Sequence, residues 1–155
     1  MTNVAKEVGL EYNFNKAIIN NTLDAHRLLH LAKKNGVQND LKEKLFAAYY
    51  TEGKDIANHA VLVNIGESSG LEAAAIRQML SSEEYIDKVH YDQNVAGEIG
   101  ANGVPFYVFN NKYAVSGAQP SEVFEEVLNK VWQEDKPPIT TSESGATCTP
   151  DGICN

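Results

Sequence analysis

The two cysteines of the chain, Cys148 and Cys154, are the residues best suited to redox chemistry. Both lie within the last eight of the 155 residues and enclose the sequence Thr-Pro-Asp-Gly-Ile. Pro150, Asp151 and Gly152 favour a turn, so the two thiols can approach each other, and closing so short a loop costs little entropy. The pair therefore predicts a reversible disulfide, and two incidental solvated thiols are the alternative.

Two histidines, His26 and His30, stand four residues apart in a helical pattern, the spacing that presents two imidazoles to one metal ion. Arg27 occupies the place where zinc proteases keep a glutamate, so the motif has no general base. We interpret both histidines as structural or surface residues and predict no metal site. Two cysteines are also too few for a zinc site made of several thiolates. His59 and His90 have no neighbours in the sequence that suggest catalysis.

The tripeptide Gly103-Val104-Pro105 opens an apolar run that continues to Phe109. Such a run is typical of a strand buried on both faces. The pair Asn110-Asn111 tolerates positive φ and joins this run to a second one, Tyr113 to Ser116, which predicts an antiparallel hairpin. From these residues alone, Pro105 only begins a strand at a place where its missing N–H costs nothing.

Composition favours an ordinary globular protein with one main core. The chain is 43% hydrophobic and has a net charge of -8, with 13 basic and 21 acidic side chains. This charge disfavours nucleic acid and anionic membrane surfaces as partners. No apolar run approaches the roughly 20 residues that cross a bilayer, and the first residues lack the pattern of a signal peptide. We therefore expect a cytoplasmic protein.

Helical signals dominate the first hundred residues. Caps, glycine stops and apolar spacing predict five helices there and one after the hairpin, from Pro120 through Trp132. In the fifth of these helices, Ser81 and Glu84 resemble a capping box at its start. Leu10, Tyr12 and Phe14 alternate with polar residues, which fits a weak strand or an extended loop. The five helices are expected over residues 21 or 22 to 34, 39 or 40 to about 53, 58 to 66, 71 to 80 and 81 to 100.

The predicted hairpin lacks neighbours. A two-stranded hairpin is only marginally stable in water, and a buried strand needs hydrogen-bonding partners on both edges. The segment from Leu10 to Phe14 is more polar than a central partner strand should be. The flanking strands are therefore expected to come from outside this sequence.

Three long motifs resemble the DsbA-like, FrnE-type branch of the thioredoxin-fold oxidoreductases, and the likeness runs in order from Val4 to Trp132. The motifs are NTLDAHRLLHLAK (Asn21 to Lys33), LFAAYYTEGKDIANHAVLVNIGESSGL (Leu45 to Leu71) and GANGVPFYVFNNKYAVSGAQP (Gly100 to Pro120). The resemblance implies an α/β fold. In it, a strand-helix-strand half with a Cys-x-x-Cys is followed by an inserted helical bundle, a hairpin and a closing helix.

The sequence departs from that pattern at the redox-active motif, because it contains no Cys-x-x-Cys. The resemblance implies a mostly α, partial thioredoxin-like fold. Residues 1–100 would form the helical insertion, residues 101–133 the hairpin and closing helix, and residues 134–155 a flexible tail with the cysteine pair. No catalytic residue is then expected in the folded part, and no cofactor. The missing half would supply the missing strands.

The resemblance also assigns roles to the proline loop. It implies a cis bond before Pro105 and a substrate-binding role for Gly103, Val104 and Pro105, with the backbone of Val104 pairing with an extended substrate. Protein thiols and disulfides would be the substrates, and the chain alone would have little or no dithiol activity.

Two other functions stay open. Glutathione-dependent isomerases and kappa-type glutathione transferases look similar across the helical insertion and need no cysteine pair, which would make glutathione a partner. A non-catalytic peptide-binding or adaptor module is the third reading. An exposed strand edge would also favour a homo-oligomer or a strand-swapped dimer.

Overall fold

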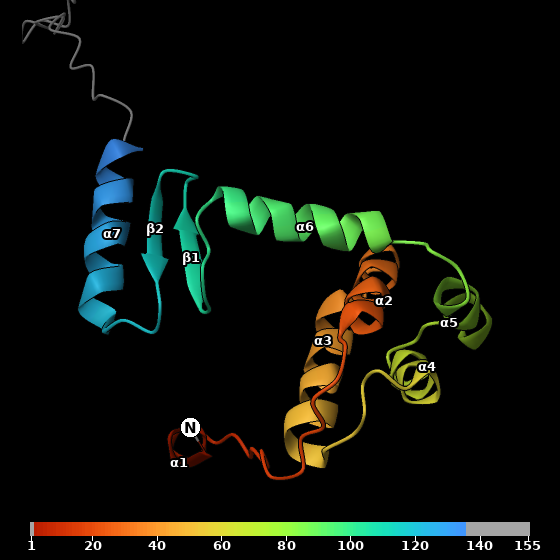
Figure 1. The fold of residues 1–155 in the computed structure, drawn as a ribbon. Helices are drawn as coiled ribbons and strands as arrows, with labels where there is room; N and C mark the ends of the chain where they lie inside the picture. The colour runs from red at the N-terminus through yellow and green to blue at the C-terminus, as the bar shows by residue number, and fades with distance from the viewer. Residues whose placement is uncertain (1, 136–155) are drawn as a thin grey trace, which may run out of the picture. The chain divides into compact units, whose positions relative to one another are not determined.

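The computed structural model describes residues 2–135, and Cys148 and Cys154 fall outside these residues. The chain divides into two compact units, Met1–Gly100 and Ala101–Asn155, which we call the helical unit and the hairpin unit (Figure 1). Within the described residues, no helix is both long and apolar enough to cross a membrane.

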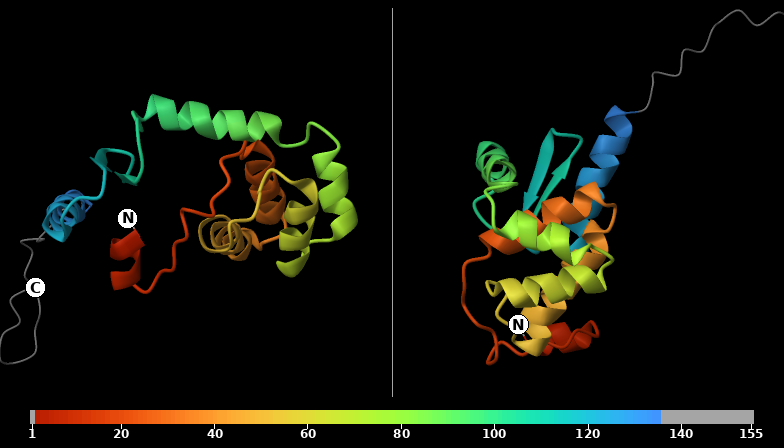
Figure 2. Two further views of the ribbon diagram at one scale, coloured as in Figure 1. Left: turned by 60° about the horizontal axis from the view of Figure 1, so that its bottom comes forward. Right: turned by 90° about the vertical axis from the view of Figure 1, so that its right-hand side faces the viewer.

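The helical unit is built around α2, which packs against α3, α4, α5 and α6 (Figure 2). Its apolar positions follow the helical period, so they form one continuous face of α2, and this face is buried. The side chains of Leu28, Leu41, Leu62, Ile76 and Met79 are completely enclosed. The elements are α1 (Thr2–Glu7), α2 (Leu23–Lys34), α3 (Gln38–Phe46), the π-helix η1 (Ala47–Glu52), α4 (His59–Ser68), α5 (Ala73–Leu80) and α6 (Ile86–Glu98).

Arg27 is a charged residue inside this core, with only 3% of its surface exposed. Its Nε donates to the carbonyl of Glu84 at 2.8 Å, and its Nη1 donates to Asp24 Oδ1 at 2.7 Å. Nη2 donates to the carbonyls of Met79 and Ser82. Because a buried charge is tolerated only when its donors are satisfied, these bonds fasten the connection between α5 and α6 onto α2.

The predicted capping box at Ser81 and Glu84 is wrong. The helix α6 begins at Ile86, after Tyr85 with φ of 68°. The Ser81 hydroxyl instead donates to the carbonyl of Gln78 and closes α5. Arg27 binds carbonyls on both sides of this segment, which holds it as a non-helical connection and delays the start of α6.

The segment from Leu10 to Phe14 forms no strand. Asn13 N donates to the carbonyl of Tyr50 at 2.7 Å, and the rings of Tyr12 and Phe14 pack on the Tyr50 ring at centroid distances of 5.0 and 5.8 Å. The alternation of apolar residues therefore serves a contact with η1, since residues two apart in an extended chain point to the same side.

Two further elements of the helical unit differ from the sequence expectations. A short first helix, α1, was not predicted. The second predicted helix changes at Ala47 into η1, which ends at Gly53 with φ of 70°. A Cβ on Gly53 would lie 2.5 Å from the Cβ of Lys16 and 2.7 Å from its carbonyl oxygen, so glycine lets the two segments touch here.

The hairpin unit contains β1 (Phe106–Phe109), β2 (Tyr113–Ser116) and α7 (Ser121–Glu134). The strands are antiparallel, with Phe106 opposite Ser116 and Phe109 opposite Tyr113. Asn110 and Asn111 have φ of 48° and 54°, and Lys112 N donates to the Phe109 carbonyl at 3.0 Å, which is the turn predicted from the asparagine pair. Among the described residues these two strands are the whole sheet.

Candidate functional site

The outer edge of β1 is the candidate site. Gly117 N donates to the carbonyl of Pro105 at 2.8 Å, so Pro105 and, by alternation, Tyr107 and Phe109 turn their backbone groups toward β2. The N–H and carbonyl groups of Phe106 and Val108 must then point the other way. Within residues 2–135 no strand pairs with them, so this edge presents unpaired donors and acceptors.

The loop before β1 continues this open edge. Val104 is 94% exposed, and among the described residues neither Gly103 nor Val104 takes part in a backbone hydrogen bond. The peptide bond between Val104 and Pro105 is cis. The three residues of the predicted substrate loop therefore lie together in one exposed bend, in which the backbone groups of Gly103 and Val104 have no partner among the described residues.

The two faces of the hairpin differ. Tyr107 and Phe109 meet Phe124 of α7 with ring centroids 4.9 and 6.5 Å apart, so α7 packs on this face, although Tyr107 stays 42% exposed. Phe106 and Val108 point to the opposite face, where Val108 is 43% exposed. The expectation of a strand buried on both faces is therefore wrong for the described residues, because among them only α7 packs on the sheet.

Ionisable groups of the hairpin unit gather at the turn end, away from the proline loop. The Tyr113 hydroxyl donates to Glu134 Oε1 at 2.5 Å, and Lys112 Nζ lies 3.3 Å from Glu134 Oε2. The hydrogen bond from Tyr113 is the main cause that lowers the pKa of Glu134, with further help from Lys112 and Lys130. Among the described residues 101–135, no acidic or basic side chain is hydrogen-bonded at the proline loop.

The structure separates the histidines that the sequence paired. His30 Nε2 lies 3.0 Å from Asp92 Oδ2 on α6. His26 instead lines a cavity beside α3. Over residues 2–135, no group of three or more histidine, cysteine, aspartate or glutamate side chains could hold a metal ion. His59, which has no partner nearby in the sequence, contacts Asp24 Oδ2 at 2.8 Å.

Asp24 joins His59 to Arg27 and so ties α4 to α2. Burial alone raises the pKa of Asp24, but the hydrogen bonds from Arg27 and His59, together with their positive charge, outweigh it. The pKa of this carboxyl is therefore lowered. Sequence reasoning missed this network because its members are up to 35 residues apart.

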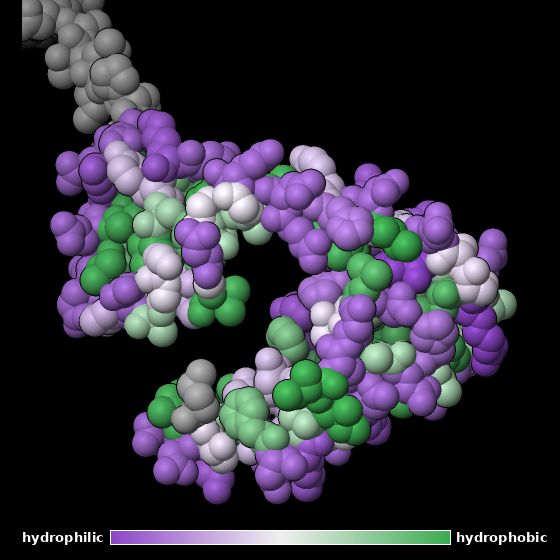
Figure 3. Space-filling model, in the orientation of Figure 1, coloured by the Kyte–Doolittle hydropathy of each residue, from purple (hydrophilic) through white to green (hydrophobic). Residues whose placement is uncertain are grey.

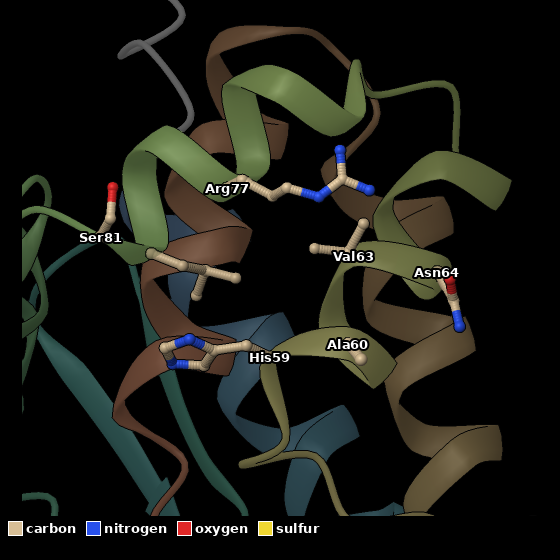
Figure 4. Close-up of a pocket in the computed structure, with 7 residues that line it drawn as sticks. His59, Ala60, Val63, Asn64, Arg77 and Ser81 are labelled. Atoms are coloured by element: carbon tan, nitrogen blue, oxygen red, sulfur yellow. The ribbon is translucent and has the colours of Figure 1, made fainter.

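A hollow between α4 and α5 lies beside this network (Figure 4). Arg77 and His59 lie on two sides of it, but Asn64 and Ser81 direct their polar atoms away from its middle (Figure 4). The polar groups do not converge on one point, so we assign the hollow no chemistry.

Three comparisons with known proteins bear on the identity of the chain. A family model described as the DSBA-like thioredoxin domain matches residues 1–143. The structure of a probable DsbA oxidoreductase from Streptomyces coelicolor is similar, with 35% sequence identity and a TM-score of 0.80 over 99% of this chain and 65% of that one.

A curated protein from Bacillus subtilis strain 168, the uncharacterized protein YwbO, is 23% identical over 128 residues, which cover 81% of this chain and 64% of that protein. The chain thus spans slightly less than two thirds of the length of either relative. The mostly helical fold with a single hairpin agrees with the partial thioredoxin-like fold expected from the sequence. The chain belongs to the DSBA-like thioredoxin domain family.

Proposed function

We propose that the chain is part of a thiol-disulfide oxidoreductase or isomerase of the FrnE type and supplies its helical insertion and hairpin half. Membership of the DSBA-like thioredoxin family supports the oxidoreductase class. The observation that carries the proposal is the open edge of β1 with the exposed loop at Val104 and Pro105. An extended polypeptide added to this edge would bond to the free backbone of Val104.

The thiols for the reaction have two sources in this proposal. The first is a dithiol in the part of the fold that this sequence does not contain. The second is the pair Cys148 and Cys154, which acts as an auxiliary dithiol. One cysteine thiolate attacks a substrate disulfide, forms a mixed disulfide and releases one substrate thiolate. The other cysteine then displaces the second substrate thiol, so the substrate gains two electrons and the cysteines are left as a disulfide.

Insulin reduction with dithiothreitol as electron donor tests this proposal. The chain alone should reduce insulin only slightly faster than dithiothreitol does without protein. The Cys148→Ser and Cys154→Ser variants should abolish this remaining turnover. Robust turnover that survives both substitutions contradicts the proposal, because no other thiol exists in the sequence. Val104→Pro, which removes the backbone N–H of Val104, should weaken binding of an unfolded polypeptide. Val108→Thr, which changes a side chain of β1 but leaves its backbone N–H in place, is the control.

A binding module without redox chemistry is the second candidate, and the same open edge favours it. Calorimetric titration with unfolded peptides and with glutathione separates the functions. Peptide binding by a monomer that transfers no electrons favours the adaptor, and binding of glutathione alone favours the isomerase or glutathione transferase branch.

The open edge also supports the proposal of a homo-oligomer, in which a second copy supplies the neighbouring strand. Sedimentation at rising protein concentration tests it. A chain that stays monomeric throughout contradicts pairing between copies without affecting the oxidoreductase assignment.

A further inference from the structure

A second cavity, of about 510 Å³, lies within the helical unit between α2, α3 and η1. This volume falls within the range of about 300–1,000 Å³ that is usual for sites of small ligands. The cavity is independent of the hairpin unit and of the proline loop. It is lined by Thr22, Ala25, His26 and Leu29 of the α2 region, Lys42, Leu45 and Phe46 of α3, Tyr49 and Tyr50 of η1, and Ile56.

Aromatic rings form one wall of the cavity. Tyr50 is held in place by ring contacts with Tyr49 at 4.9 Å and Phe46 at 6.0 Å, and by Tyr12 and Phe14 behind it. Phe46 stays half exposed, and the surface over the lower end of α3 is visibly apolar (Figure 3). A large ring held in place but left open to solvent is typical of a site that gains its cover from a ligand.

The wall beside Tyr49 and Tyr50 is a π-helix rather than an α-helix. Such elements are rare and frequently occur at functional sites, because the wider turn sacrifices regular hydrogen bonds. At the end of η1, Gly53 lies so close to Lys16 that a side chain would not fit between them.

The residues that line the cavity include basic side chains but no acidic ones. Its lining contains no aspartate or glutamate, whereas it contains His26 on α2 and Lys42 on α3, in a chain of net charge -8. Lys42 Nζ contacts Asn39 at 2.9 Å and the exposed carboxylate of Glu43 at 3.2 Å. An ammonium has three N–H donors, so one remains for a ligand. The lining therefore matches an apolar molecule with a single negative end.

We propose that this cavity binds an apolar monocarboxylate. The hydrocarbon body lies against Leu29, Leu45 and the aromatic wall, and the carboxylate accepts hydrogen bonds from Lys42 and His26. Apolar contact supplies most of the affinity, and the two basic side chains select the anion over a neutral molecule of the same shape.

Octanoate and 1-octanol, which share a chain length and differ in charge, are the probes for this site. The test is calorimetry together with ¹³C methyl shifts of the whole chain. Octanoate should shift the methyl signals of Leu29, Leu45 and Ile56, and it should bind about three- to fivefold more tightly than 1-octanol, the selectivity of an exposed ion pair. Shifts that avoid these methyls, or equal affinity of the two probes, overturn the proposal.

Substitutions locate the site. Phe46→Ala should weaken both probes by about tenfold through lost aromatic contact, and Lys42→Met should weaken octanoate alone. Tyr91→Ala and Lys34→Met remove a ring and a charge from exposed positions outside the cavity and serve as controls. All four positions are at least partly exposed, so the fold should survive, and unchanged circular dichroism verifies this. Equal losses in the control variants overturn the proposal.

Discussion

The helical unit and the hairpin unit use their apolar residues differently. In the helical unit, 15 buried apolar side chains form one continuous cluster. In the described part of the hairpin unit, Val115 is the only buried apolar side chain, although β1 and α7 are just as apolar in sequence. Enclosure thus depends on how many surfaces surround an element, and α2 has four neighbouring helices whereas the hairpin has one.

This difference shows which unit can stand alone. A sheet of two strands covered on one face buries too little surface to offset the entropy of ordering it. The hairpin covers only part of the apolar stripe of α7, because Leu128 and Trp132 remain exposed. The hairpin unit therefore leaves apolar residues exposed that a further packing partner would bury, whereas the helical unit already encloses its own core.

The largest expected contrast comes from truncating one buried side chain to alanine in each unit. Leu28→Ala in the helical unit should cost about 3 kcal/mol of unfolding free energy, because it leaves a cavity in an enclosed site. Val115→Ala in the hairpin unit should cost less, about 1 kcal/mol, because it removes two carbons rather than three and only α7 packs on this sheet. Urea unfolding followed by circular dichroism measures both. Similar losses would break the comparison.

The next effect concerns the buried guanidinium. Arg27→Met should cost about 2–3 kcal/mol, since it removes the guanidinium donors to the carbonyls of Ser82 and Glu84, whereas the Met79 carbonyl keeps its bonds from Ser82. Arg77→Met is the matched control, because Arg77 is exposed, and it should change stability by less than about 0.5 kcal/mol. An Arg27→Met chain as stable as the Arg77→Met control would show that the hydrogen bonds of Arg27 contribute nothing to stability.

A smaller effect depends on pH. The pKa of Asp24 is lowered in the folded chain from its ordinary value of 3.8, so the unfolded chain takes up this proton at higher pH. The stabilisation is therefore fully present above pH 3.8 and is lost as pH falls through the lower, folded value. Asp24→Asn should cost at most about 1 kcal/mol at pH 7 and progressively less toward pH 2. Unfolding curves measured from pH 7 to pH 2 check this prediction. A loss of unfolding free energy that persists at low pH would mean that the contacts of Asp24 with Arg27 and His59 are not its cause.

The smallest effect is expected on α7. Trp132→Gln should change unfolding free energy by less than about 0.5 kcal/mol in dilute solution, because the ring is 66% exposed. Repeating the measurement at high protein concentration sharpens the comparison. A loss that grows with concentration would mean that a second copy covers this ring.

Local signals accounted for much of the fold. Apolar spacing located α2, α4, α5 and α7, and Asn110 and Asn111 adopt the positive φ that the turn requires. The sequence could not locate the start of α6, because a guanidinium more than 50 residues earlier holds the preceding carbonyls. The aromatic residues around Tyr12 alternate as in a strand, yet they pack on a π-helix that no period distinguishes from an α-helix.

The candidate site was less accessible to such reasoning. The proline loop was located only through the resemblance to a family, and its substrate-binding role stays a prediction. The pairing of Cys148 with Cys154 also stays a prediction, since both lie outside the described residues. The network of His59, Asp24 and Arg27 carries no sequence signal, because α4 and α2 meet only in three dimensions.

Gly53 sets a limit on how this molecule can be altered. Even the single methyl group of alanine would collide with the Cβ and the carbonyl oxygen of Lys16, so the backbone at Lys16 or at residue 53 would have to shift. A saturation library at this position should yield one viable genotype, whereas the neighbouring exposed Lys54 should accept most replacements. A fluorophore or crosslinker intended for this corner of the molecule therefore belongs on Lys54.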